Sequence, residues 1–272
     1  LRIVAVCWLA VGLAGPRSIH ARDHAQLEGI DIVLALDLSL SMQAGDIEPN
    51  RFEATKYVVG DFVRRRPNDR IAAVVFGREA YTLLPLTTDR EALHHLVDEL
   101  QLGVIEGRGT AIGNAVGVSL NRLRRSMAKS KVIILLTDGD SNSGNLSPQQ
   151  GAELAEHMQV KLYTILMGRS EQASAPSGLD LFGRTLFSKG SFPINPKLLE
   201  EMAGRTGGQA FVVSDRGELE RSFHSILDTL EKSQIEDAGR VYSPLFSGFV
   251  GAAVVLLLLE ALLGTLILRR WP

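Results

Sequence analysis

Apolar residues occur along the chain in two alternating patterns. Continuous runs of Ile, Val, Leu and Ala that end at a polar residue are typical of strands buried on both faces of a sheet. Stretches with apolar residues at helical spacing, or with a capping residue at their start, predict helices. The predicted strands are 32–36, 70–76, 80–84, 131–137, 160–167 and 209–213, and the predicted helices are 50–65, 89–100, 110–126, 147–158, 197–205 and 218–232.

The order of these elements predicts an α/β fold. Strands that alternate with helices form a mostly parallel sheet with helices on both faces. Two short strands around Gly77-Arg78 predict a hairpin that makes one edge of this sheet. Thr88 is expected to cap the helix over 89–100. The predicted architecture is therefore a mostly parallel sheet with one antiparallel edge strand.

The first buried run ends in a carboxylate, Asp37, and hydroxyl groups follow at Ser39 and Ser41. Open α/β sheets bind ligands at the carboxyl ends of their strands, and a turning loop can aim both hydroxyls toward the carboxylate. One carboxylate with two neutral oxygens suits a hard cation such as Mg2+. The alternative interpretation is a strand end capped by a turn, in which the serines bond to the local backbone.

Two later stretches favour the metal interpretation. The run 131–137 repeats the design of a buried strand followed by a carboxylate, Asp138. Between the two carboxylates, Thr110 lies in the glycine-rich loop 106–113, which opens a predicted helix. The glycines of this loop have the wrong spacing for a dinucleotide-binding loop. Three separated loops thus offer oxygen ligands.

The pattern Asp37-x-Ser39-x-Ser41, followed by the distant Thr110 and Asp138, resembles the metal-ion-dependent adhesion site (MIDAS) of the von Willebrand factor A domain. The resemblance covers residues 30 to about 231. Within that family the sequence is similar to the BatA-like aerotolerance proteins of bacterial membranes. The segments that carry this similarity are DIVLALD, NRFEATK, DRIAAVVFGREAYTLLPLT, GTAIGNAV and SKVIILLTDG. One departure is Leu40, where the family usually has Gly and where a side chain could stiffen or crowd the loop.

The resemblance implies a doubly wound, Rossmann-like sheet in which the strand ending at Asp37 lies beside the strand before Asp138. It also implies that Ser39 and Ser41 ligate Mg2+ (or Mn2+) directly, and that Thr110 and the two Asp residues contribute directly or through water. Two carboxylates roughly neutralise the dication, and an exchangeable water remains. An acidic residue of a partner protein can displace that water, so we expect a metal-dependent protein-interaction module and not an enzyme.

Two alternative functions stay open. A metal-dependent hydrolase would use the same ion to activate water, but it needs a general base, and no His falls in the three motif loops. The sequence also lacks a Gly-x-Ser-x-Gly nucleophile turn and a Gly-x-x-x-x-Gly-Lys phosphate loop. The other alternative is a structural, membrane-tethered domain without a bound metal.

Both ends of the chain are apolar and predict membrane segments. Residues 245–268 carry one charge, Glu260, and are followed by Arg269 and Arg270, which predicts a transmembrane helix with a cytoplasmic end. Glu260 is expected to face a partner helix or water, or else to snorkel or be protonated. The apolar run within 1–16 is too short to span a bilayer alone. It is expected to be the tail of a truncated membrane helix, with a signal peptide as the alternative.

These features predict the following segments. They are an N-terminal membrane segment (1–16), a linker (17–29), the von Willebrand factor A domain (30–232), a connector (233–244) and a transmembrane helix (245–268). The protein is expected to be multi-pass in a bacterial inner membrane, with its domain outside the cytoplasm. The resemblance implies partners among other Bat-type membrane proteins and a MoxR-type ATPase.

The long segment 168–196 is rich in Gly, Ser and Pro, and we predict an irregular loop with a small hairpin at 182–187. Loops of this length in a compact domain are usually functional or mobile. Because this segment leaves the carboxyl end of a strand, it is expected to flank the metal face.

Composition and charge exclude two further classes. A net charge of -2 and a pI near 6.4 give no reason to expect nucleic acid as a partner. The single cysteine, Cys7, excludes an internal disulfide and a thiolate metal cluster. The basic end of the helix 110–126 is expected to be a solvated face, with a docking patch for an acidic partner as the alternative.

Overall fold

The computed structural model describes residues 10, 17–20, 29–139, 141–168, 172–179, 185–191, 194–237, 241–244 and 246–266. The chain divides into two compact units. The larger unit comprises residues 27–234, and the smaller one combines residues 1–26 with residues 235–272.

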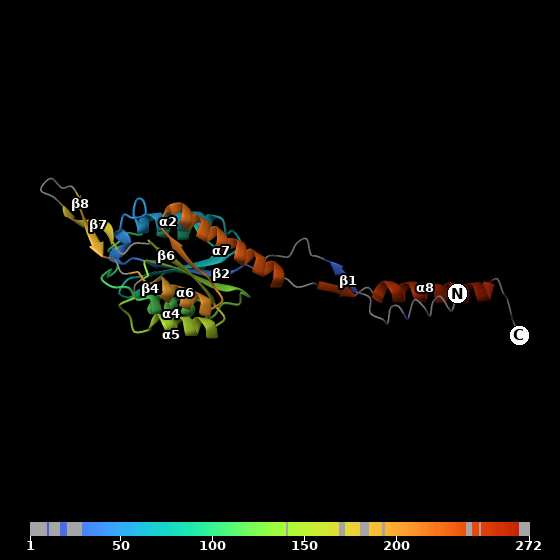
Figure 1. Cartoon of the computed structure of the whole chain (residues 1–272). Helices are drawn as coiled ribbons and strands as arrows, with labels where there is room; N and C mark the ends of the chain where they lie inside the picture. The colour runs from blue at the N-terminus through green and yellow to red at the C-terminus, as the bar shows by residue number, and fades with distance from the viewer. Residues whose placement is uncertain are drawn as a thin grey trace. The chain divides into compact units, whose positions relative to one another are not determined.

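A six-stranded sheet forms the centre of the larger unit (Figure 1). Its strands are β2 (Asp31–Asp37), β3 (Arg70–Phe76), β4 (Ala80–Thr87), β5 (Lys131–Thr137), β6 (Lys161–Met167) and β9 (Ala210–Val213), in the order β4-β3-β2-β5-β6-β9. Among these described strands, β4 alone is antiparallel to its neighbour. The predicted mostly parallel sheet with one antiparallel edge strand is therefore confirmed. The strands β2 and β5 are central neighbours, as the resemblance implies.

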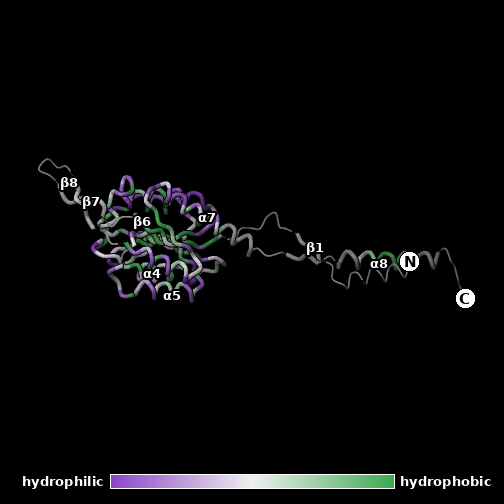
Figure 2. Tube along the Cα trace, viewed as in Figure 1, coloured by the Kyte–Doolittle hydropathy of each residue, from purple (hydrophilic) through white to green (hydrophobic). Residues whose placement is uncertain are grey.

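Helices cover both faces of this sheet. One face carries α2 (Arg51–Arg64), α3 (Arg90–Asp98) and α7 (Arg216–Asp237), and the other carries α4 (Ile112–Leu123), α5 (Pro148–His157) and α6 (Pro196–Arg205). In β2, Ile32, Leu34 and Leu36 belong to the first core cluster, while Val33 and Ala35 belong to the second. Successive side chains of a strand point to opposite faces, so a continuous apolar run serves both cores. Figure 2 shows these strands as the hydrophobic centre of the unit.

Side-chain caps determine where the helices start. Asn50 accepts the backbone N–H of Glu53 in the first turn of α2. The predicted cap Thr88 is wrong, because Asp89 caps α3 by accepting the N–H of Ala92. A carboxylate at this position also complements the positive end of the helix dipole, which a threonine does not.

We predicted that the segment 168–196 is irregular apart from a small hairpin. The structure instead contains a larger hairpin in this segment. In it, β7 (Gln172–Leu179) pairs antiparallel with β8 (Thr185–Ser191). Part of the predicted hairpin at 182–187 lies outside the described residues. Gln, Ala, Ser, Pro and Gly make up most of β7, and these residues give little strand signal. The strand β7 contacts η1 (Leu40–Gln43), the 3-10 helix in the loop after β2.

The smaller unit contains a second two-stranded sheet. Here β1 (Arg17–His20) pairs antiparallel with β10 (Val241–Pro244). The predicted linker 17–29 contains β1, and the predicted connector 233–244 contains β10 and the end of α7, which extends as far as Asp237. The two strands are short and distant in sequence, so neither carries enough periodicity to reveal their pairing.

The helix α8 (Phe246–Leu266) occupies most of the predicted transmembrane segment 245–268. Across the described residues, however, no helix meets the length and hydrophobicity needed to cross a membrane. The predicted flanking transmembrane helices are therefore unsupported. Apart from residue 10, the predicted N-terminal membrane segment 1–16 lies outside the described residues, as does the side chain of Glu260.

Close packing between α4 and the loop before α5 yields a stability prediction. A Cβ on Gly113 would collide with the carbonyl oxygen of Leu146, so Gly113→Ala is expected to lower the free energy of unfolding by about 1–3 kcal/mol. Gly204→Ala in α6 is the control, because its Cβ would meet no described atom within 4 Å, and alanine there should stabilise by about 0.5–1 kcal/mol. Urea unfolding measures both changes, and equal stabilities would contradict the packing argument.

Candidate metal centre

Asp37 and Asp138 lie at the same edge of the sheet. Asp37 is the last residue of β2, and Asp138 directly follows β5, the parallel neighbour of β2. The strands that follow β2 in sequence, β3 and β4, lie on one side of this pair, and the strands that follow β5 in this sheet, namely β6 and β9, lie on the other side. The position between β2 and β5 is therefore the switch point where open α/β sheets bind ligands. Asp37, Ser39 and Asp138 are 0%, 2% and 2% exposed. The fold therefore brings two predicted carboxylates together in a buried position.

Both oxygens of the Asp37 carboxylate accept hydrogen bonds. Oδ1 accepts the backbone N–H of Ser39 at 2.8 Å, and Oδ2 accepts the hydroxyl of Thr137 at 2.6 Å. The hydroxyl oxygens of Ser39 and Ser41 lie 2.9 Å apart, so the first loop gathers both predicted hydroxyls near the carboxylate. Thr137 is absent from the predicted residues. Its place at the end of β5, directly before a carboxylate, is the signal that could have found it.

Thr110 lies in the predicted loop 106–113, which we call the third loop, and is 4% exposed. Its backbone N–H donates to Oδ1 of Asn142 at 3.0 Å, and its carbonyl oxygen accepts the N–H of Asn142 at 3.1 Å. The N–H of Leu40 donates to the carbonyl oxygen of Gly107 at 3.1 Å. The three predicted loops are thus joined by hydrogen bonds. Because its backbone is engaged in this way, Thr110 precedes α4, which starts at Ile112 and not at Thr110 as predicted.

Leu40 stands where a glycine is expected. Its side chain is 44% exposed, and a Cβ on Gly107 would lie 3.5 Å from Leu40 Cγ. Leu40 therefore packs beside the third loop and adds an apolar group to the rim of the candidate metal centre.

The electrostatics of the pair are unfavourable without a cation. The pKa of Asp37 is raised from 3.8 to about 7, first because burial disfavours the charged form and second because the Asp138 carboxylate lies nearby. The hydrogen bonds from Ser39 and Thr137 act in the opposite direction and lower it. A bound cation would offset the cost of holding both carboxylates ionised.

The available ligands suit a hard divalent cation. Carboxylates and the hydroxyls of Ser39, Ser41 and Thr110 are oxygen donors, which Mg2+ and Mn2+ prefer. Within the part of the chain that the structure describes, no three or more His, Cys, Asp and Glu side chains gather to hold a metal. A cation at this edge would therefore depend on the hydroxyl groups. The residues present fit a small divalent ion with an incomplete protein shell.

Arg51, the first residue of α2, is fully buried beside this centre. Its Nε and Nη2 donate to Asp46 at 2.8 and 2.7 Å, and its Nη1 lies 3.6 Å from Oδ2 of Asp138. A Cβ on Gly168 would collide with this guanidinium, so the backbone after β6 packs directly on it. Arg51 thus places a permanent positive charge between the carboxylates of Asp46 and Asp138. The helical pattern of 50–65 does not distinguish a buried arginine from a solvated one, so sequence reasoning missed it.

A polar groove of about 780 Å³ adjoins the centre. Asn142, which lines this groove, is also the residue that forms hydrogen bonds with Thr110. Its lining includes Arg78, Glu79, Asn114, Asn121, Asn142 and Asn145. Amide and charged groups of this kind can bind a polar segment of a ligand next to the metal position.

The raised pKa of Asp37 predicts a pH dependence of stability in the metal-free protein. Because the folded-state pKa lies above the unfolded value, the folded protein holds a proton that the unfolded chain releases between about pH 4 and 7. This contribution to stability is present at low pH and is lost as the pH rises through 7, by on the order of 3 kcal/mol. Urea unfolding in EDTA from about pH 5 to 8 measures it.

Asp37→Asn is the matched variant for this measurement. Its amide can accept the N–H of Ser39 and donate to the Thr137 hydroxyl, but it has no proton to lose. The variant should lack the Asp37 part of the pH dependence while all other titrating groups remain. Parallel stability profiles for the wild type and the variant would show that the Asp37 pKa is not raised.

The buried ion pair of Arg51 yields a second stability prediction. Arg51→Met removes the cation between two carboxylates and is expected to lower the free energy of unfolding by about 3–5 kcal/mol. Arg64→Met is the control on the same helix, because it breaks an exposed pair with Asp61 and should cost less than about 1 kcal/mol. Urea unfolding compares the two variants. Similar small losses would mean that Arg51 does not stabilise the centre.

Comparison with known proteins identifies relatives in sequence. The family model of the von Willebrand factor type A domain matches residues 31–225 of the sequence. An uncharacterized protein of Borreliella burgdorferi is 35% identical over 216 residues, which cover 78% of this chain and 62% of that protein. This chain therefore spans less than two thirds of the length of that relative.

Solved structures share the fold. An aerotolerance-related membrane protein from Bacteroides fragilis aligns with a TM-score of 0.63 at 23% identity, over 74% of this chain and 100% of that chain. Proximal thread matrix protein 1 from the mussel byssus, with a zinc-occupied MIDAS motif, aligns with a TM-score of 0.53 at 22% identity, over 87% of this chain and 51% of that one. Since the family model matches most of the chain, this protein belongs to the von Willebrand factor type A domain family.

Proposed function

We propose that this chain is a divalent-metal-dependent protein-interaction module. Its metal ligands would be Asp37, Ser39, Ser41, Thr110 and Asp138, with Mg2+ or Mn2+ as the ion. The observation that carries this proposal is the meeting of two buried carboxylates with hydroxyl-bearing loops at the switch point of the sheet. The zinc-occupied MIDAS motif of the mussel protein supports metal binding on this fold.

Charge and coordination favour recognition of an acidic partner. Two carboxylates roughly balance a dication, while the three hydroxyl ligands are neutral. When bound, the ion supplies an electron-poor position that a Glu or Asp of a partner protein can complete. The exposed Leu40 and the polar groove lined by Asn142 lie around this position. They would select among acidic partners by apolar contact and hydrogen bonding.

Binding is a better proposal than catalysis. Metal-assisted hydrolysis needs a base to take a proton from water, and the three motif loops contain no His. Asp138 also has a cationic partner already, because Nη1 of Arg51 lies 3.6 Å from its Oδ2. We therefore assign the chain an adhesion-type role and not an enzymatic one.

The proposal extends to the cellular setting. We place the chain among BatA-like proteins of a bacterial envelope, acting with other Bat-type membrane proteins and a MoxR-type ATPase in aerotolerance or envelope stress. The Bacteroides fragilis structure, described as an aerotolerance-related membrane protein, supports this setting. The apolar sequence 245–268, with one charge, would attach the chain to the inner membrane, with its domain outside the cytoplasm.

A pull-down from bacterial membrane extract tests the proposal, with the full chain as bait. Partners should bind the wild type in Mg2+ and be lost in EDTA or with Asp37→Ala, because both changes remove the metal. Asp98→Ala, at an exposed position of α3, removes the same charge elsewhere and should keep the partners. Recovery of the same proteins in every arm would rule out metal-bridged recognition.

A thermal-melting arm separates the two ways in which this experiment could fail. Mg2+ at about 100 times its Kd should stabilise the wild type and Asp98→Ala by about 2.7 kcal/mol, and it should leave Asp37→Ala unchanged. If Mg2+ and Mn2+ do not raise the Tm of the wild type, the domain is structural and holds no metal. If they do and no partner responds to EDTA, the metal does not bridge to a protein.

A further inference from the structure

The loop between α4 and β5 is strongly basic. Residues 107–137 contain no Asp or Glu, and their cationic residues are Arg108, Arg122, Arg124, Arg125, Lys129 and Lys131. We call residues 124–131 the basic loop. In it, Arg124, Arg125 and Lys129 are exposed. Met127 is 93% exposed, the largest value among the exposed large hydrophobic residues that the structure describes.

Met127 lies at the tip of a compact turn. The N–H of Ser126 donates to the carbonyl oxygen of Leu123 at 2.9 Å, and the N–H of Ala128 donates to Oγ of Ser126 at 3.1 Å. Hydrogen bonds thus hold the backbone on both sides of Met127, while its side chain is in solvent. An apolar tip between cations is typical of a surface that contacts a membrane interface.

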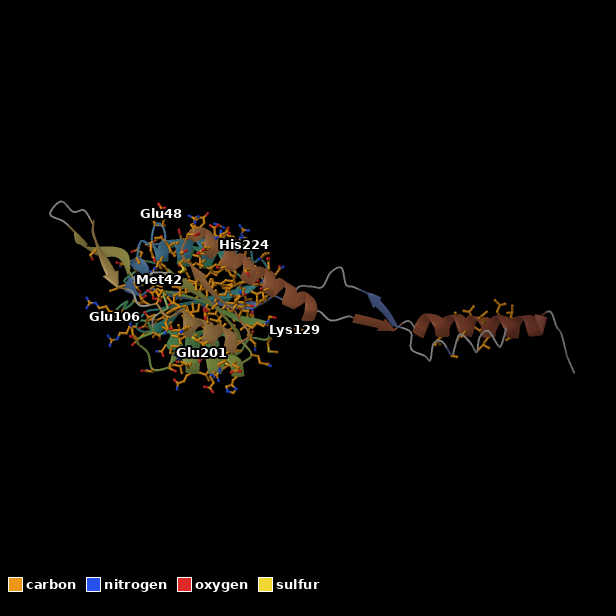
Figure 3. The ribbon with its side chains drawn as sticks, in the orientation of Figure 1. Met42, Glu48, Glu106, Lys129, Glu201 and His224 are labelled. Carbon is orange, nitrogen blue, oxygen red and sulfur yellow. The ribbon has the colours of Figure 1, made fainter. Side chains whose placement is uncertain are left out.

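The basic loop lies at the edge of the sheet opposite the candidate metal centre. The helix α4 starts next to Thr110 and runs away from that edge, and the N–H of Asp31, at the start of β2, donates to the carbonyl oxygen of Ser130 at 3.2 Å. Figure 3 shows Lys129 at the end of the domain opposite Met42 and Glu106. The chain enters the domain at this edge, and α7 returns toward it because it follows the carboxyl end of β9.

Two acidic residues at this edge, Asp31 and Asp69, already have arginine partners. Asp31 accepts a hydrogen bond from Nε of Arg70 at 2.8 Å, and Asp69 pairs with Arg66. Asp31 and Asp69 are buried, with 1% and 4% of their surface exposed. Their negative charges are paired with Arg70 and Arg66. Arg124 and Arg125 are exposed, so their positive charge faces solvent, although the whole chain has a net charge of -2.

We infer that the basic loop binds the anionic headgroups of a phospholipid surface, with Met127 inserted among them. Each Lys or Arg near an anionic membrane surface strengthens binding about fivefold. The attraction acts within about 10 Å at ordinary salt, so a local patch suffices in a chain of slightly negative charge. A lipid surface is favoured over an acidic protein because the tip is apolar and because both chain connections leave from this edge.

The connection at the carboxyl end leads to the apolar sequence 245–268. The inference uses the proposed membrane association but is independent of the metal. A domain that rests on lipid through its basic loop would present the opposite edge, with Asp37 and Asp138, away from the membrane. Partner proteins would then have free access to that edge.

Vesicle sedimentation of the full chain tests the inference. The vesicles are phosphatidylcholine alone, or equal parts of phosphatidylcholine and phosphatidylglycerol. The anionic lipid should raise the partition coefficient, and Arg124→Gln with Arg125→Gln should reduce that increment by about tenfold or more. Arg78→Gln with Arg108→Gln is the matched control, since it removes two exposed charges from the opposite edge and should leave the increment unchanged. An increment of wild-type size in both double variants would overturn the inference.

A fluorescent probe locates the contact. Cys7 is the only cysteine, so Met127→Cys in a Cys7→Ser background carries one polarity-sensitive dye. Its emission should shift to the blue with anionic vesicles, in EDTA as well as in Mg2+, and should stay unshifted with phosphatidylcholine. No shift with anionic vesicles would overturn the inference. A response to soluble polyglutamate without a response to vesicles would assign the loop to an acidic protein instead. Failure of the metal proposal alone would leave all these results unchanged.

Discussion

Two carboxylates, Asp37 and Asp138, are buried at the ends of neighbouring central strands, and the surrounding structure holds their charge in place. Burial and mutual repulsion raise the pKa of Asp37 to about 7, so the pair is costly to ionise. The backbone of Ser39, the hydroxyl of Thr137 and the guanidinium of Arg51 each oppose that cost. Such a centre is stable enough to fold, yet it still favours an added cation.

The parallel sheet separates two kinds of loop. Every connection from a parallel strand to the next helix lies at the carboxyl edge, and every return from helix to strand lies at the amino edge. The candidate metal centre uses the first kind, while the basic loop between α4 and β5 is of the second kind. The charge of one edge can therefore vary without disturbing the ligands at the other. A single domain can in this way carry two unrelated surfaces.

Much of the fold could be predicted because local pattern and tertiary role agree. The runs before Asp37 and Asp138 are apolar throughout, since strands covered on both faces need no polar alternation. Predictions failed where the decisive contact is distant or made by the backbone. The pairing of β7 with β8 and of β1 with β10 uses backbone hydrogen bonds that composition does not reveal. The cap at Asp89 was missed because neighbouring Thr88 is also a common capping residue.

The sheet, the separate loops and the residue types that suit a hard cation could all be predicted from local sequence, because each depends on a few adjacent positions. The other groups that share the site are known only from the folded chain. Asn142 ties down Thr110, Thr137 bonds to Asp37, and Arg51 meets Asp138 from a helix far away in the sequence. Such contacts depend on strand order and on how closely the backbone packs at Gly168. Neither is a local property, so neither can be predicted from a pattern of adjacent residues.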